Sequence, residues 1–201
     1  MTQSTPRLKA SIHRRASDWR SVLTLGTLAG AGGAFIWVMP RIKREYREEG
    51  HLLRPTVGMV YAAYGLHLAA FVLAVSGRKA GNVPLTSSVL GWTLAGSGAA
   101  LFVSGWRTLP VTDDSALTTS GLKTGGVYRL SRNPQNVGWA MLMFGVSLAR
   151  RSWAGTGLAA LFWGMFLNYL PAEEAFLEQT YGQAYRRYKA HTPRSLGWRC
   201  L

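Results

Sequence analysis

The chain has 201 residues, of which 23 are Lys or Arg and only nine are Asp or Glu, giving a formal net charge of +14. One cysteine excludes a disulfide bond within the chain, and no soluble basic segment carries the base-reading or stacking residues of a nucleic-acid-binding protein. No Ser-His-Asp order and no ligand-spaced group of histidines stands out, so neither hydrolase chemistry nor a metal site is expected.

Long uncharged runs predict an all-α integral membrane protein with about five transmembrane helices. A bilayer core of about 30 Å needs roughly twenty apolar helical residues, and in lipid the backbone polar groups must be paired within the segment. Four runs have nineteen to twenty-two residues, and these are Ser21–Met39, Thr56–Gly77, Leu85–Trp106 and Ser152–Ala172. A fifth run, Val137–Ala149, has thirteen residues and is marginal by itself.

The first half of the chain divides into a basic N-terminal tail, residues 1–20, and three transmembrane helices within residues 21–106. The tail is expected to be mobile. The first span is expected to end at Pro40, since proline interrupts helical hydrogen bonding. The charged segment Arg41–Arg54 then predicts a loop or a short helix at the membrane interface.

Residues 107–201 predict a structured loop, a helical hairpin over residues 134–171 and a C-terminal helix. Asn133 and Pro134 are typical of a helix N-cap and first helical position, and they predict a helix from Pro134 to Ala149. Ser152 predicts the N-cap of the next helix. At 1.5 Å per residue the hairpin should place Arg132 beside Asn168 or Tyr169.

An acidic pair, Glu173 and Glu174, follows the hairpin in a chain that has few acids. Two carboxylates in a partly dry setting repel each other unless a cation joins them, so we expect a cationic ligand such as a sulfonium or ammonium group. Beyond the pair, residues 173–190 predict an amphipathic interfacial helix with tyrosines and basic residues. Those tyrosines also fit an ordinary aromatic belt at the membrane surface.

The spacing of this region resembles the isoprenylcysteine carboxyl methyltransferase and phospholipid methyltransferase superfamily of membrane enzymes. The matching positions cover residues 117–195, and they are Gly126, Tyr128, Arg132, Pro134, Gly138, Gly145, Leu148, Ser152, Glu173, Glu174, Leu177, Tyr181, Gly182, Tyr185, Tyr188, Pro193 and Arg194. The resemblance implies methyl transfer from S-adenosylmethionine to a lipid or small-molecule acceptor, which is a carboxylate, an amine or a thiol.

The resemblance also implies the site residues. Arg132 and Glu174 are the implied catalytic residues. The implied cofactor-binding positions are Gly121, Gly126, Tyr128, Asn133, Pro134, Gly138, Glu173 and Glu174. Methyl transfer from a sulfonium requires in-line placement and exclusion of water more than proton-transfer groups.

Two positions depart from the family pattern, because Asn133 replaces a histidine and Asn136 replaces a tyrosine. Asparagine can cap a helix as histidine does, whereas the change at Asn136 removes an aromatic wall expected for the cofactor. The basic residue that prenylcysteine enzymes carry before the acidic pair falls here near Asn168 or Tyr169. A prenylcysteine carboxylate substrate is therefore not supported.

The expected location is an integral membrane protein of the plasma or inner membrane in a bacterium, or of the endoplasmic reticulum in a eukaryote. The face that holds the C-terminus carries fourteen basic residues against nine on the other, which favours a cytoplasmic C-terminus and active site. Two alternatives stay open: a membrane reductase of the sterol type that uses NADPH, and a non-catalytic membrane subunit that keeps the fold.

Overall fold

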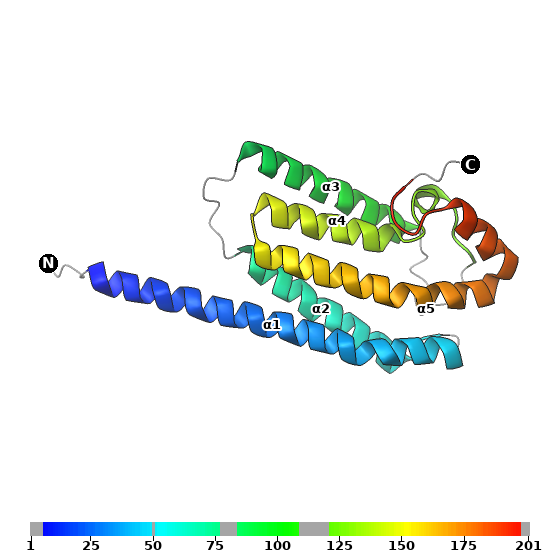
Figure 1. Ribbon diagram of the computed structural model, residues 1–201, viewed down its shortest axis with the longest axis horizontal. Coiled ribbons are helices and arrows are strands. Elements are labelled where there is room, and N and C mark those ends of the chain that lie inside the picture. Colours follow the sequence, from blue (N-terminus) through cyan, green and yellow to red (C-terminus); the bar gives the residue numbers. More distant parts are fainter. Residues whose placement is uncertain (1–5, 50, 77–83, 109–120, 198–201) are drawn as a thin grey trace.

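The computed structural model describes residues 6–49, 51–76, 84–108 and 121–197, and in these ranges the chain is all-helical. Its helices, in chain order, are α1 (Pro6–Glu48), α2 (Arg54–Ser76), α3 (Leu85–Arg107), the short 3₁₀ helix η1 (Gly126–Arg129), α4 (Pro134–Ala149) and α5 (Trp153–His191). The five α-helices lie along one long axis and alternate in direction, so the ends of α1, α3 and α5 meet the starts of α2 and α4 (Figure 1).

Three helical segments in the described part of the chain are long and apolar enough to cross a bilayer: Leu25–Glu48 of α1, all of α2 and all of α3. These correspond to the first three predicted spans. The prediction of an all-helical membrane protein is confirmed at this level, and α4 and α5 are considered below as further spans.

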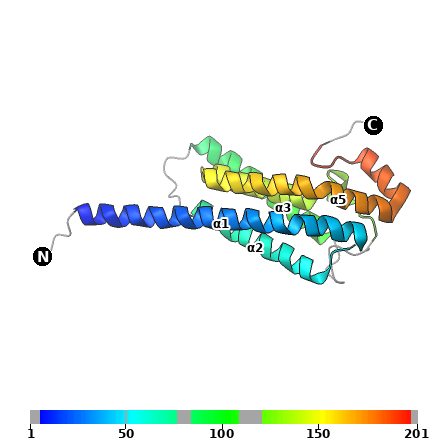
Figure 2. The ribbon, with the colours of Figure 1, turned by 60° about the horizontal axis from the view of Figure 1, so that its bottom comes forward.

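α1 is longer than the sequence suggested. It begins at Pro6, within the predicted mobile tail, and passes through Pro40 to Glu48 without a break. Its N-terminal part extends beyond the other helices in both views (Figures 1 and 2). The predicted helix end at Pro40 is therefore wrong, and residues 6–20 of the predicted N-terminal tail are helical.

Packing explains why the helix continues past Pro40. Val38, Ile42 and Tyr46 are buried in one apolar cluster against α2 and α5, and this burial offsets the hydrogen bond that proline removes. The buried carboxylate of Glu45 then joins α1 to the start of α2, since it accepts hydrogen bonds from the Leu53 N–H at 3.0 Å and other donors. The segment predicted as a loop is thus mostly helix.

Glycines bring α3 and α4 into backbone contact. Gly98 of α3 lies against Gly138 of α4, and a Cβ built on Gly98 would come within 2.5 Å of the Leu142 nitrogen. Gly91 of α3 and Gly145 of α4 form the same contact two turns further along. Small residues at helix interfaces permit this close approach, which anchors α4 firmly to the third span.

The α4–α5 hairpin has the predicted bounds at its start and at its turn. α4 runs from Pro134 to Ala149 with Pro134 in the first turn, and Ser152 caps α5 by accepting a hydrogen bond from the Gly155 N–H at 3.1 Å. The hairpin does not end near Pro171, because α5 continues to His191. The predicted C-terminal helix is therefore the last part of α5.

The direction of α5 changes at Gly182 rather than at Pro171. Gly182 has a φ of 51° and a ψ of −122°, which lie outside the helical region and which glycine adopts at little cost. After this residue the chain folds back toward the start of α4 (Figures 1 and 2). The turn brings the C-terminal segment over the loop that precedes α4.

Candidate active site

The C-terminal segment is hydrogen-bonded to the loop that enters α4. The Arg132 N–H donates to the Pro193 carbonyl at 2.9 Å. The side-chain amide of Asn133 donates to the Arg194 carbonyl at 3.0 Å. Asn133 occupies the N-cap position as predicted, but its side chain makes no cap hydrogen bond; it holds the C-terminal segment instead.

Glu174 forms the charged centre of this junction. Its carboxylate lies 3.0 Å from the Arg132 guanidinium and accepts two hydrogen bonds from Arg194, at 2.7 and 3.1 Å. The side chains of Arg132 and Glu174 are only 7% and 6% exposed. The hydrogen bonds to Glu174 raise the pKa of Arg194 above its ordinary value. Glu174 is thus neutralised by cations from its own chain.

The Arg132 side chain forms its ion pair with Glu174, about one turn further along α5 than its predicted neighbours Asn168 and Tyr169. Those two side chains instead contact α1: Asn168 accepts a hydrogen bond from Lys43 at 2.8 Å, and the Tyr169 hydroxyl lies 2.8 Å from that of Tyr46.

Glu173 lies on a different side of α5 from Glu174, because successive helical residues are about 100° apart. It borders a cavity of about 190 Å³ between α1, α2, α4 and α5. One oxygen of Glu173 and the side-chain nitrogen of Gln135 are buried and have no hydrogen-bond partner among the described residues. The cavity is lined by Phe35, Met39, Ile42, Leu52, Val57, Val60, Tyr61, Tyr64, Gln135, Asn136, Phe162, Met165, Phe166, Tyr169 and Glu173.

Tyrosines surround the Glu173 carboxyl group. Tyr64 and Tyr169 line the cavity with it, and Tyr46 and Tyr128 lie near enough for their hydroxyls to feel its charge. A carboxylate among aromatic rings is a favourable environment for an organic cation, since ring faces attract positive charge. A buried carboxylate oxygen without a partner is costly, and a proton, a hydrogen-bond donor or a cationic ligand would each satisfy it.

Burial and the nearby charge of Glu174 raise the pKa of Glu173 to about 7. Burial and the charge of Glu173 also raise the pKa of Tyr128 to about 12. Glu173 can therefore hold or release a proton near neutral pH, whereas Tyr128 remains a neutral hydroxyl. Two adjacent glutamates thus have different chemistry: Glu174 is paired, and Glu173 is available.

The remaining predicted positions divide into two groups. A Cβ on Gly138 would lie 2.5 Å from the Phe102 nitrogen, and the Pro134 ring lies close to Gly105, so both residues serve the packing of α4 on α3. Gly121 and Gly126 have φ values of 66° and 59° with open space around them. Gly121 lies in the segment between α3 and η1, of which residues 109–120 are outside the described ranges, and Gly126 is the first residue of η1.

Several lining residues were not among the predicted site residues. Tyr64 comes from the second span, and nothing local in the sequence relates it to Glu173. Gln135 follows Pro134 directly, and its position inside the matching motif was the only available signal. Asn136, where the family pattern has a tyrosine, does line the cavity, and Tyr64 and Tyr169 supply aromatic walls there.

No group of three or more His, Cys, Asp or Glu residues in the described ranges is arranged to hold a metal ion. The site therefore consists of a buried carboxyl group, aromatic rings and amide side chains. This donor set fits the sulfonium and ammonium groups of S-adenosylmethionine better than it fits a metal.

Known proteins include a family that resembles this part of the chain. The family model for phospholipid methyltransferases matches residues 86–184, which include α3, η1, α4 and most of α5. Neither a curated protein nor a solved structure matches the chain. Residues 86–184 are similar to the phospholipid methyltransferase family, and on this basis the chain is a membrane methyltransferase that uses S-adenosylmethionine.

Proposed function

We propose that the chain methylates the amine headgroup of a membrane lipid, and that the reaction takes place at the cavity beside Glu173. The observation that carries the proposal is the buried, unpartnered carboxylate oxygen of Glu173 among tyrosine rings. The family similarity supports a phospholipid-like acceptor. A cavity of about 190 Å³ is smaller than a typical ligand site of about 300–1,000 Å³, so it suits the reacting ends of two larger molecules.

We further propose that α4 and α5 cross the membrane with the first three spans. α4 has 16 residues, about 24 Å at 1.5 Å per residue, and is shorter than a bilayer core of about 30 Å. The uncharged run at the start of α5 ends at Ala172, so Glu173 lies just outside it, at one membrane surface. The excess of basic residues around this end of the bundle favours the cytoplasmic side.

S-adenosylmethionine supplies an activated methyl group on a sulfonium. The chain supplies the environment: Glu173 and the faces of Tyr64 and Tyr169 hold positive charge, and the Gln135 amide donates a hydrogen bond to an oxygen of either substrate. An ammonium headgroup must lose a proton before its nitrogen can attack. Glu173, whose pKa is about 7, accepts that proton on its unpartnered oxygen.

Arg132 and Glu174 have a positioning role in this scheme. Their ion pair, together with Arg194, fixes the C-terminal segment on the loop before α4. It thereby fixes the position of Glu173, the preceding residue of α5, about 100° around the helix. Loss of this ion pair would shift the position of Glu173, although neither Arg132 nor Glu174 contacts the substrates.

The test is calorimetric binding of S-adenosylmethionine to detergent-purified protein, with Glu173→Gln and Glu174→Gln as a neighbouring pair of variants. We expect Glu173→Gln to remain folded and to bind the cofactor at least tenfold more weakly. Glu174→Gln should chiefly lower the melting temperature, since it leaves two arginines without their carboxylate. A folded wild-type protein that does not bind S-adenosylmethionine would overturn the proposal.

A further inference from the structure

A second hollow lies between α1 and α5, next to the Glu173 cavity and open to the outside of the helix bundle. It is a groove of about 730 Å³, open to the surroundings of the helices. Most of its length is apolar, and only one end is polar. Ile36, Leu161 and Gly164 line the apolar part. Lys43, Arg47 and Asn168 line the polar end.

The apolar part of the groove has the shape of a channel for a hydrocarbon chain. Gly164 forms part of its floor, and a Cβ at this position would touch nothing within 4 Å. Ile36 is 77% exposed and lies along the wall that α1 provides. In a membrane-spanning helix pair such a surface faces lipid, and an acyl chain fills it with favourable dispersion contacts.

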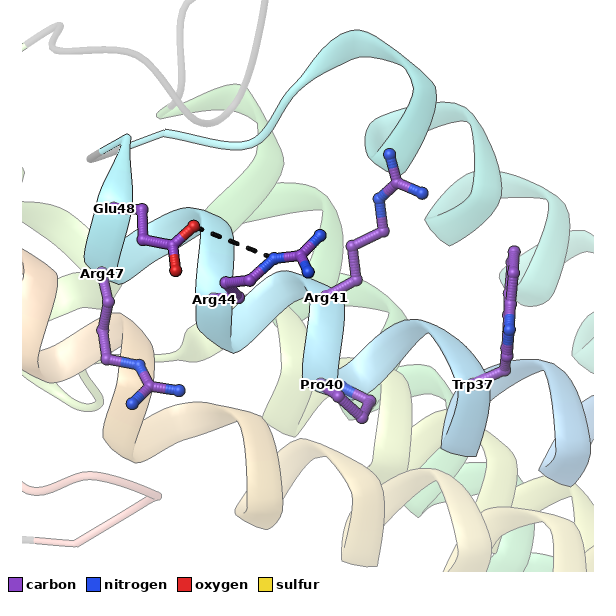
Figure 3. Close-up of a pocket in the computed structure, with 6 residues that line it drawn as sticks. All are labelled: Trp37, Pro40, Arg41, Arg44, Arg47 and Glu48. Carbon is purple, nitrogen blue, oxygen red and sulfur yellow. Dashed lines mark ion pairs between the residues drawn. The ribbon is translucent and has the colours of Figure 1, made fainter.

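The polar end of the groove is cationic. Lys43 donates to the Asn168 side chain at 2.8 Å, and Arg47 donates to the Lys43 carbonyl. Among the described residues no carboxylate forms an ion pair with either of them. Figure 3 shows the neighbouring outer face of α1, where Arg44 pairs with Glu48 at 3.9 Å while Arg47 extends away from that pair. Lys43 and Arg47 therefore provide positive charge where the channel ends.

The groove and the Glu173 cavity share part of their walls. Phe35 and Met39 of α1 and Met165 of α5 line both. These three side chains therefore stand between the groove and the neighbouring part of the cavity. Methionine is unbranched and adapts its rotamer readily, so a narrow headgroup can pass where a rigid wall would exclude it.

We propose that the groove between α1 and α5 binds one phospholipid from the bilayer. Its acyl chain lies along Ile36 and Gly164, and its phosphate is held by Lys43 and Arg47. Its headgroup points between Met39 and Met165 toward Glu173. The identification of this lipid as the methyl acceptor rests on the proposed function, whereas the binding of the lipid does not.

The experiment is photolabelling of purified protein by a phosphatidylethanolamine with a diazirine at mid-chain, without S-adenosylmethionine, followed by peptide mapping. We expect label on the α1 and α5 segments that line the groove. Gly164→Leu should reduce it at least fivefold by filling the channel. Gly157→Leu is the matched control, because it adds the same side chain to α5 at another position with open space and outside the groove lining.

The phosphate site has its own matched pair of variants. Lys43→Gln should abolish the preference for this probe over a diacylglycerol with the same diazirine chain, and Arg44→Gln should preserve it. Label outside the groove, or equal label in Gly164→Leu and Gly157→Leu, would overturn the inference. Failure of the proposed function would show separately, as absent cofactor binding in protein whose groove is still labelled.

Discussion

The contact between α3 and α4 yields a prediction that the structure makes quantitative. A methyl group added by Gly98→Ala would lie 2.5 Å from the Leu142 nitrogen and 2.6 Å from the Gly138 carbonyl oxygen. An ordinary contact is about 3.4–4 Å, so the helices must separate by about 1 Å or more. Overpacking of this kind costs about 1–3 kcal/mol.

Gly96→Ala is the control for this substitution. Gly96 is also on α3, but a Cβ there meets nothing within 4 Å. Alanine is favoured over glycine in a helix by about 0.8–1.0 kcal/mol, so this variant should be slightly more stable than the wild type. The same gain applies to Gly98→Ala, and the steric cost must exceed it for the predicted loss to appear.

The assay is thermal unfolding of both variants in one detergent, followed by size-exclusion chromatography of heated samples. We expect Gly98→Ala to melt below the wild type and Gly96→Ala at or above it. Equal melting temperatures for the two variants would refute the backbone contact, and with it the account of how α4 is anchored to the third span.

Three further predictions concern the site and its supports. The pKa of Glu173 is raised to about 7, so the wild type should lose stability as the pH rises from about 4.5 through 7. The rate of methyl transfer should increase over the same range. Glu173→Gln should show neither the change in melting temperature nor the change in rate. Arg132→Met should cost about 1.5–3 kcal/mol in denaturant unfolding, since it removes one charged partner of the buried Glu174 while Arg194 remains. Ser152→Ala should lower the free energy of unfolding by about 0.5–2 kcal/mol, because α5 loses its N-cap. An unchanged free energy of unfolding would contradict that role.

Local signals in the sequence identified α4 well. Asn133 and Pro134 mark its start, and the arginine pair before Ser152 marks the turn, because caps and turns depend on a few adjacent residues. The ends of α1 were not predictable in the same way. Pro40 usually ends a helix, and only the burial of Val38, Ile42 and Tyr46 against other helices keeps this one intact.

The sequence by itself determined the membrane class and the start and turn of the hairpin, since apolar run length and the spacing of cap residues are properties of the chain alone. Only the tertiary structure separated Glu173 from Glu174. The kink at Gly182 returns Arg194 to Glu174, while Tyr64 and the end of α1 enclose Glu173. These contacts join residues between 20 and more than 100 positions apart, and no local pattern encodes which of two neighbouring carboxylates receives the arginines.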